Sequence, residues 1–524
     1  MREFNFVIRE SLKNGLIRDF REPRNVDYCE ELLNLKPTEF GAVSPEAVVD
    51  PTASTVAWPF PQLFRGKRVT LLCGSTVIYS VNESTWTLTP LVTYSINAPA
   101  TPKSIVAGGP WHFADFYDSW ILTNGSCQVF KAAFSTKTFV QDSVTIRTAC
   151  NWWDGRLVYG GFAAGDSWMS RWQALFDAQD ANVPTELKNI LDYTKGVDKN
   201  WIYVGAVGGG DLLIFFDSYY NRYGTHAAGY DDTSPAPLPG ESFDYSSTNP
   251  FIFHVLAQNT HAFRPMPYQG EVYCCLPMGK SLLVYGEDGI AAFSSAGEYV
   301  AQPDIAGLGS GVGLASRSAV GGNESGHMFV DQGGDLWFIS PDLQATRLGY
   351  RHIFSEMLSG EIIVSFDPVE KDYWITDGAK CYIHSRTGLG GPIETMPTGL
   401  SRDKAGRLIG ARVPSNTSFF RLLTHDLDIG ESGTKHVSEL QVDVEGAEQV
   451  RGRVSFLSDG IFRTTPWANM NPNGVIFPRS SFAVGRIGVL GNATGDVRLS
   501  TVEVRYQNED RRFRRGTKGQ PEAS

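Results

Sequence analysis

The sequence predicts an all-β protein with a β-propeller-like core, a C-terminal antiparallel β-sandwich and an extended N-terminal arm. Three observations support this fold class. Short apolar runs separated by Gly, Asn-Gly or Asp-Gly turns fill most of the chain, as in β-hairpins. Apolar and polar residues then alternate strictly within residues 435–506. The 54 glycines among 524 residues suit a fold that has many tight turns.

Residues 1–51 are expected to form a docking arm that reaches another protein or a neighbouring copy of the chain. The segment mixes basic and acidic residues, and several prolines favour an extended backbone. Its apolar residues, such as Phe4, Leu12 and Phe20, are too sparse to build a separate core. The residues expected to make the docking contacts are Arg18, Asp19, Arg21 and Arg24. A frayed terminus is the alternative interpretation.

Residues 52–425 are expected to form the propeller-like domain. One hairpin unit recurs at spacings of roughly 40–70 residues, which indicates radial repetition of about six or seven units. Two units align closely, since DSWILTNGSCQV begins at Asp118 and DYWITDGAKCYI begins at Asp372. A set of unrelated β-sandwiches of similar length is the alternative.

Two insertions interrupt this rhythm. Residues 167–196 have apolar residues at helical spacing, with Pro184 near a plausible helix start, and predict a helical insertion. Residues 217–270 are rich in Tyr, Ser, Pro and Gly and predict a long loop insertion. The aromatic content of this loop favours an ordered contact surface.

The pattern changes after residue 425. Residues 426–508 show the alternation and turns of a small antiparallel β-sandwich. Residues 509–524 form a basic C-terminal tail, for which a subunit interface or a nucleic-acid contact are both possible partners. In a chain of net charge −11, acidic protein surface is the preferred partner. The tail residues assigned to the subunit interface are Arg511, Arg512, Arg514 and Arg515.

Composition limits the compartment and the partners. A net charge of −11 argues against a chain that wraps nucleic acid, although such a chain can let DNA slide past. The seven cysteines contain no CxxC spacing and are expected to be reduced, and the adjacent Cys274 and Cys275 should point to opposite faces of a strand. Without a signal-peptide pattern or an apolar run of membrane length, we expect cytoplasmic synthesis and no membrane insertion.

The motifs do not predict catalysis, a cofactor or a metal site, so the chain is not expected to be an enzyme. Gly279-Lys280-Ser281 resembles the end of a phosphate loop, but a strand follows it instead of a helix. The histidines show no metal-ligand spacing. Propellers can hydrolyse glycans with two carboxylates, and the candidates here are Asp231-Asp232, Glu287-Asp288 and Asp115 with Asp118. Acidic residues at such positions more often cap turns.

Both ends of the chain resemble a known family. The segment GLIRDFREP…YCEELLNLKPTEFGAVSPEAVVDP…WPFPQLFRGK (residues 15–67) resembles the N-terminal region of short-tailed (podovirus-type) bacteriophage tail hub or nozzle proteins. These include the packaged-DNA stabilisation and tail-tubular nozzle proteins. The segment LSTVEVRYQNEDRRFRRG (residues 499–516) resembles the close of such proteins. The motifs are loose and contain no catalytic signature.

This resemblance implies a structural virion protein of the phage tail, assembled in the host bacterial cytoplasm. Its subunits would form a hexameric ring that extends the portal–adaptor channel, retains packaged DNA and opens for ejection. The implied partners are the tail adaptor, on which the N-terminal arm would dock, tail fibre or needle proteins, and duplex DNA in transient passage. The alternative function is a glycan-binding or glycan-hydrolysing propeller, either receptor-binding or sialidase-like.

Overall fold

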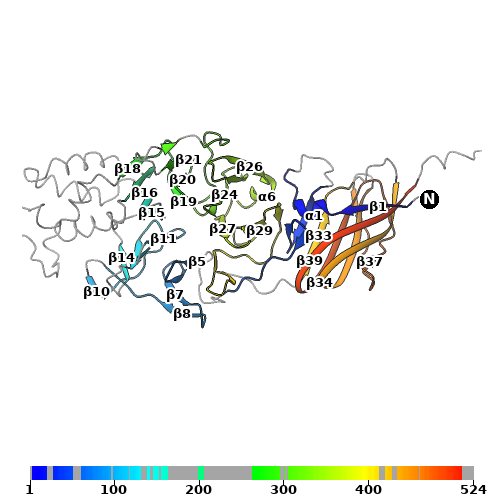
Figure 1. Cartoon of the computed structure of the whole chain (residues 1–524), viewed down its shortest axis with the longest axis horizontal. Helices are drawn as coiled ribbons and strands as arrows, with labels where there is room; N and C mark the ends of the chain where they lie inside the picture. The colour runs from blue at the N-terminus through cyan, green and yellow to red at the C-terminus, as the bar shows by residue number, and fades with distance from the viewer. Residues whose placement is uncertain are drawn as a thin grey trace, which may run out of the picture.

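The computed structural model is nearly all β and forms two lobes, a propeller and a sandwich (Figure 1). Two short helices lie in the described residues, α1 (Glu10–Asn14) and α6 (Arg351–Phe354). The structure describes residues 3–19, 27–50, 61–95, 98–116, 119–131, 138–141, 146–152, 155–162, 199–205, 262–294, 301–302, 305–411, 419–427, 434–458 and 461–509.

The propeller is built from sheets arranged in a ring, which confirms the predicted fold class; the strand pairs are antiparallel except for β9 with β14. Five sheets are four-stranded blades: β5–β8 (Gln62–Arg65, Thr70–Cys73, Ile78–Asn82, Thr87–Pro90), β15–β18 (Ile146–Trp152, Arg156–Phe162, Trp201–Val204, Ala262–Pro265), β19–β22 (Val272–Met278, Ser281–Gly286, Ile290–Ser294, Ala301–Gln302), β23–β26 (Val320–Asn323, Gly326–Val330, Leu336–Ile339, Ala345–Gly349) and β27–β30 (Ile363–Asp367, Asp372–Thr376, Cys381–His384, Leu389–Gly390).

Two further sheets complete the ring. The six-stranded sheet contains β9–β14 (Thr93–Ser95, Ala98–Pro102, His112–Phe116, Ser119–Thr123, Gln128–Lys131, Thr138–Gln141), and the two-stranded sheet contains β31 and β32 (Leu400–Arg402, Leu408–Gly410). Val49 forms a parallel bridge with Ile409 of β32, so the N-terminal segment contributes to the last sheet. Because β31 contacts both β27 and β5, the ring closes between its last and first sheets.

The two hairpins that align in the sequence adopt the same turn. They are β12–β13 and β28–β29. Asn124 Oδ1 accepts hydrogen bonds from the backbone N–H of Ser126 (2.9 Å) and the residue after it (2.8 Å). Asp377 Oδ1 accepts the equivalent pair at 2.8 and 2.7 Å. The glycine that follows each acceptor has φ near +80°, which explains why Gly recurs there.

The sandwich is organised around two long paired strands, β34 (Thr434–Ser458) and β39 (Gly485–Glu509). Register shifts lie between Asp443 and Arg451, where the pair bends. A Cβ on Gly452 would meet Leu440 and Ile476, so the two halves of the bent pair pack face to face. The other strands of this sheet are β1 (Glu3–Ile8), β2 (Cys29–Leu33), β3 (Lys36–Thr38), β4 (Gly41–Val43), β33 (Phe419–Thr424), β35 (Ile461–Thr464), β36 (Ala468–Asn469), β37 (Val475–Ile476) and β38 (Ser480–Phe482).

The predicted separate arm, residues 1–51, needs correction. Within the described residues, β1 pairs antiparallel with β39 in six-residue register, β2 pairs with β33, and β4 pairs with β39. Ile8, Leu12 and Leu16 are almost fully buried in the core that both lobes share. These few apolar residues do not form a core of their own, but they complete one built by distant strands.

Two predicted boundaries also shift. The propeller was expected to extend to residue 425, but β33 pairs with β39 and belongs to the sandwich sheet. The loop predicted for residues 217–270 ends earlier, because β18 pairs with β17 as the outer strand of its blade. Its short, proline-ended run HAFRP gives little pattern to detect in sequence. The predicted helical insertion, residues 167–196, and residues 217–261 lie outside the described residues.

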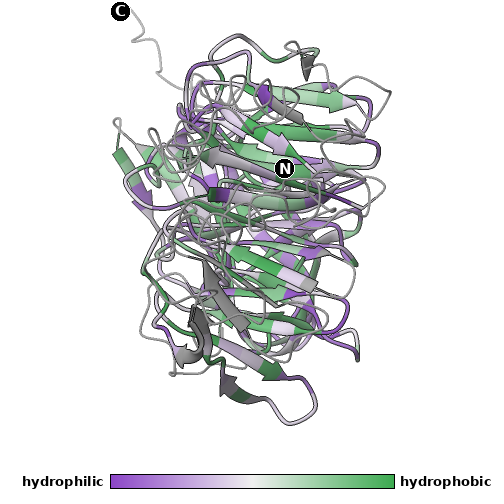
Figure 2. Ribbon diagram, turned by 90° about the vertical axis from the view of Figure 1, so that its left-hand side faces the viewer, coloured by the Kyte–Doolittle hydropathy of each residue, from purple (hydrophilic) through white to green (hydrophobic). Residues whose placement is uncertain are grey.

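Both lobes share one continuous apolar core. The largest buried cluster includes Leu283 and Ile375 of the blades, Leu12 of α1, and Val437 and Val502 of the sandwich. Figure 2 shows apolar residues concentrated along the strands and hydrophilic residues in many of the connecting segments. Smaller clusters fill the spaces between the other blades. The sandwich is therefore packed onto the propeller and is not tethered to it by a free linker.

Candidate functional site

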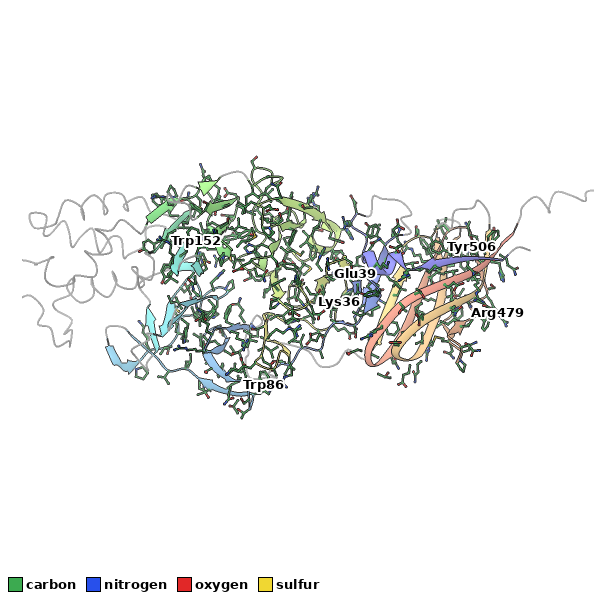
Figure 3. The ribbon with its side chains drawn as sticks, viewed as in Figure 1. Lys36, Glu39, Trp86, Trp152, Arg479 and Tyr506 are labelled. Carbon is green, nitrogen blue, oxygen red and sulfur yellow. The ribbon has the colours of Figure 1, made fainter. Side chains whose placement is uncertain are left out.

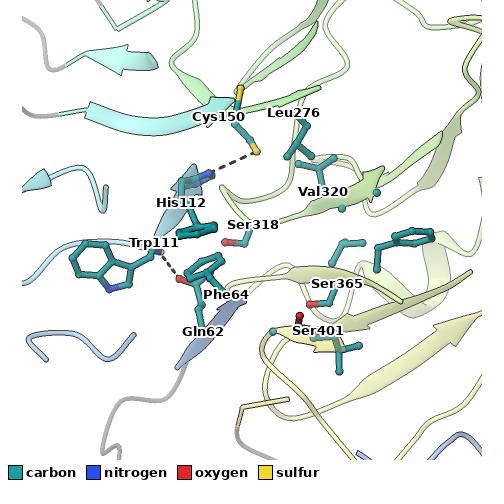
Figure 4. A pocket seen from close by; sticks show the side chains of 18 of the residues that line it. Gln62, Phe64, Trp111, His112, Cys150, Leu276, Ser318, Val320, Ser365 and Ser401 are labelled. Carbon is teal, nitrogen blue, oxygen red and sulfur yellow. Dashed lines mark hydrogen bonds between the residues drawn. The ribbon is translucent and has the colours of Figure 1, made fainter. Parts of the chain in front are cut away.

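A cavity lies at the centre of the propeller (Figure 4). It has a volume of about 600 Å³ and opens among the inner strands of all seven sheets in the ring. Those strands are β5, β11, β15, β19, β23, β27 and β31. Each inner strand is the first described strand of its blade, except in the six-stranded sheet, so the ring itself creates the cavity.

Side chains in the wall hold neighbouring blades together. The Trp111 backbone N–H donates to Gln62 Oε1 at 2.5 Å, and its indole Nε1 donates to the Gly74 carbonyl at 2.9 Å. Phe64 and Phe113 stack with ring centroids 5.6 Å apart. Figure 4 shows Gln62, Phe64 and Trp111 grouped on this side of the cavity. These contacts stabilise the junction between the β5–β8 blade and the six-stranded sheet. The hydrogen bonds also occupy polar groups that could otherwise bind a ligand.

His112 is the group in the wall that most resembles a catalytic residue. Its Nδ1 lies 3.3 Å from Thr148 Oγ1 and 3.8 Å from Cys274 Sγ. Burial, together with the positive charge of Arg317, lowers the pKa of His112 to about 4. Burial raises the pKa of the Cys274 thiol to about 12. Both groups are therefore neutral at pH 7, whereas nucleophilic cysteine chemistry requires a thiolate.

All seven cysteines are buried free thiols, as the sequence predicted. The side chains of Cys274 and Cys275 enter different core clusters, which confirms that they point to opposite faces of β19. Burial raises the pKa of Cys150 and of Cys275 as well. These thiols pack as small apolar side chains between blades.

Ion pairs occupy both ends of the inner strands. At one end Glu271 bridges Arg147 and Arg317, and the Arg317 guanidinium lies 5.9 Å from the centre of the Tyr273 ring. At the other end Arg402 Nε donates to Asp367 Oδ1 at 2.9 Å. Arg402 also donates to Glu46 Oε1 at 2.8 Å, and these carboxylates raise the pKa of its guanidinium. Two arginines thus share one carboxylate at the first end, whereas two carboxylates share one arginine at the second.

The candidate catalytic carboxylates cap loops. Asp115 Oδ2 accepts the Lys67 backbone N–H at 2.6 Å, and Asp288 Oδ1 accepts that of Gly270 at 2.7 Å. Asp118, Asp231 and Asp232 lie outside the residues whose side chains the structure describes. Within the part that the structure describes, no group of three or more His, Cys, Asp or Glu side chains could hold a metal ion. None of the described helices is long and apolar enough to span a bilayer.

The predicted docking residues that the structure describes contact the chain's own propeller. The Arg18 carbonyl accepts the Tyr350 backbone N–H at 3.0 Å. Burial lowers the pKa of His384, and the charge of Arg18 contributes to this shift. Asp19 lies near His352, where its charge opposes the lowering of that pKa by burial. The other residues assigned to docking or to the subunit interface, Arg21, Arg24, Arg511, Arg512, Arg514 and Arg515, lie outside the described residues.

A clamp between the lobes was not predicted from sequence. We define it as residues 15–19 and 27–43, which lie between the β28–β30 edge and the sandwich (Figure 3). Lys36 Nζ contacts Asp372 Oδ2 at 2.5 Å, and both side chains are more than nine-tenths buried. Ser385 Oγ donates to the Pro37 carbonyl at 2.7 Å. The Leu32 backbone N–H donates to the Gly391 carbonyl at 3.0 Å. In the sequence, nothing around Lys36 indicates that its side chain forms a buried ion pair.

No protein-family model matches the sequence, and no curated protein matches it either. PorZ, a surface component of the type-IX secretion system of Porphyromonas gingivalis, is 8% identical, with 79% of this chain and 45% of PorZ covered and a TM-score of 0.34. This chain therefore spans less than half the length of PorZ.

Two further solved structures are similar at the same low level. AztD from Citrobacter koseri is 9% identical, with 83% of this chain and 90% of AztD covered and a TM-score of 0.33. YCF48 bound to D1 peptide is 8% identical, with 70% of this chain and 90% of YCF48 covered and a TM-score of 0.33. Values this low support no argument about ligands or partners, and the description of the fold rests on the strand pairing above.

Proposed function

We propose that this chain is a structural subunit of a short-tailed bacteriophage tail, a hub or nozzle protein that works as a ring. In the proposal six copies surround the channel below the portal and adaptor, retain packaged DNA and release it at ejection. The sequence resemblance at residues 15–67 and 499–516 motivates this function. A wall that holds DNA under pressure must resist deformation, so the subunit should be rigid.

The observation that supports the proposal best is the joining of the two resembling segments in one body. β4 pairs with β39, so segments more than 400 positions apart share a sheet. The clamp then fixes this sheet to the blades through the buried Lys36–Asp372 pair. Propeller, clamp and sandwich also share one core. A rigid body of this kind suits a load-bearing wall.

The chemistry of the propeller centre agrees with a structural role. His112 and Cys274 are both neutral at pH 7, and Asp115 and Asp288 are used to cap loops. The overall charge of −11 suits a channel that DNA passes without adhering, because each additional phosphate contact would raise affinity. A glycan-acting propeller would instead require a spaced pair of free carboxylates facing the cavity.

The test combines assembly with location. We expect purified protein to form rings of six by light scattering and negative-stain electron microscopy, and antibodies against it to label phage tails. The same protein should show no turnover of sialosides or capsule glycans. A protein that stays monomeric at 100 µM and hydrolyses a glycan, with activity lost on one Asp or Glu substitution, would contradict the proposal.

A further inference from the structure

One side of the sandwich differs in charge from the rest of the chain. We call it the flank: residues 451–458 of β34 together with residues 461–480, which contain β35, β36, β37 and β38, all of which pair with β34. Among residues 451–480 there are four arginines, at 451, 453, 463 and 479, and a single acidic residue, Asp459. This balance contrasts with the net charge of −11 for the whole chain.

The flank also exposes large apolar side chains. The exposed fractions are 66% for Ile461, 48% for Phe477, 40% for Leu457 and 36% for Phe462. All four residues of β35 are exposed, and β35 ends the strand order of its sheet, so one side of its backbone ladder has no partner strand among the described residues. Monomeric proteins usually protect such an edge with proline, lysine or a covering loop. An apolar, open edge of this kind indicates a binding surface.

Three of the four arginines of the flank are exposed and available to a partner. Arg451, Arg463 and Arg479 are exposed, and none makes a hydrogen bond or ion pair through its side chain within the part that the structure describes. By contrast, Arg453 lies over the Trp467 ring, 4.3 Å from its centre. Arg479 is found at the outer margin of the sandwich, far from the propeller (Figure 3). The flank therefore presents unpaired positive charge beside apolar surface.

A surface of opposite charge lies on the same lobe. We call it the acidic bend: the turn region of the long β34–β39 pair, where Asp443, Glu445, Glu448 and Asp496 are all exposed. Arg498 is the basic residue opposite Glu445 in the strand register. No ion pair to these four carboxylates occurs among the described residues.

We propose that the flank of one copy docks on the acidic bend of a second copy, and that this contact assembles the ring. The proposal rests on the proposed function and deepens it by naming the subunit interface. The flank and the bend are different surfaces of one lobe, so the contact is heterologous. Its repetition forms a closed ring when the rotation between neighbouring copies divides a full turn, as the proposed ring of six requires. Arginine–carboxylate pairs give specificity, while exposed side chains of the flank, Ile461 above all, supply apolar area. Duplex DNA would use the arginines but would leave these apolar side chains without a partner.

Cysteine cross-linking tests the orientation of the contact. All seven native cysteines are buried, so an introduced surface cysteine is the accessible thiol. Mixing the variants Phe462→Cys and Glu448→Cys under mild oxidation should give disulfide-linked dimers, and neither variant should do so alone. Dimers of Phe462→Cys with itself would show a symmetric contact and overturn the proposal. An absence of cross-links in every mixture at ring-forming concentration would overturn it too.

Charge reversal tests the energetic contribution of the contact. The variant Arg463→Glu with Arg479→Glu should weaken ring assembly at least tenfold, as should Asp443→Arg with Glu448→Arg. A chain with all four changes should recover assembly. The control is Arg386→Glu on the propeller, where Arg386 is 84% exposed and meets Glu39 at 3.6 Å; this variant should assemble normally.

The outcomes separate this inference from the proposed function. Rings that survive both reversals would refute the interface, whereas tail labelling by antibody would still support the hub assignment. Unlabelled tails, with cross-links that form as expected, would refute the hub assignment and leave the self-contact intact. Loss of 30-base-pair DNA binding in the Arg463→Glu, Arg479→Glu variant, with rings unchanged, would assign the flank to nucleic acid instead.

Discussion

Several buried ionisable side chains of this chain have shifted pKa values. His112, His327 and His384 sit between blades, and burial lowers the pKa of each to about 4. Tyr285 Oη lies 2.9 Å from His327 Nδ1, so that ring is held in place as well as buried. Asp372 behaves in the opposite sense, because burial raises its pKa to about 6.

These pKa shifts predict loss of stability in mild acid. An unfolded histidine titrates near pH 6.5, so between pH 6.5 and 4 the unfolded chain binds protons that the folded chain does not, and stability falls as pH falls. The raised pKa of Asp372 acts in the opposite direction, because below about pH 6 the folded chain binds a proton there that the unfolded chain does not. This single carboxyl cannot offset the effect of three histidines. We expect the urea midpoint to fall steadily from pH 7 to pH 5. The variant His112→Gln should reduce the slope by about 1.4 kcal/mol per pH unit, and an unchanged slope would contradict this.

At the scale of elements, strands and turns were predicted far better than their assignment to lobes. The hairpins β12–β13 and β28–β29 were found from sequence because a glycine at positive φ and an acceptor side chain are required at fixed places. The pairing of β1 with β39 was not found, because no local pattern encodes a partner about 500 residues away. For the same reason no sequence motif predicts the cavity, because its wall is built from seven sheets. The β35 edge could have been noticed as an arginine-rich run in an acidic chain.

The docking of β3 on β28 predicts a non-additive pair of mutations. Lys36→Met leaves Asp372 buried without its counter-charge, so the free energy of unfolding should fall by about 3–5 kcal/mol. The double variant Lys36→Met, Asp372→Leu should regain most of this loss, as measured by urea denaturation. The control is Lys380→Met, because Lys380 and Glu356 are 44% and 64% exposed. It should cost less than about 1 kcal/mol. Additive losses in the double variant would refute a coupled pair.

For the whole molecule, the shared core predicts that the two lobes unfold together. Leu16 belongs to the largest buried cluster, and its neighbours come from both the blades and the sandwich. We expect one calorimetric transition. The variant Leu16→Ala should lower the free energy of unfolding of the whole chain by roughly 2–5 kcal/mol, the cost of a large cavity. Hydrogen exchange should report similar opening free energies for β28 and β39. Two separate transitions, with only one shifted by the mutation, would show independent lobes.

The pairing of the first strand with the last also constrains how the chain reaches its native state in the cell. Phe6 pairs with Val504, and Val49 pairs with Ile409. At roughly 5–20 residues per second, a ribosome needs about half a minute to two minutes to supply the partner of β1. During translation the N-terminal strands must remain unpaired or form temporary contacts, and the ring of blades stays open until residue 409 has emerged. High contact order of this kind makes late, slow closure the expected last step of biogenesis, well after individual hairpins have formed.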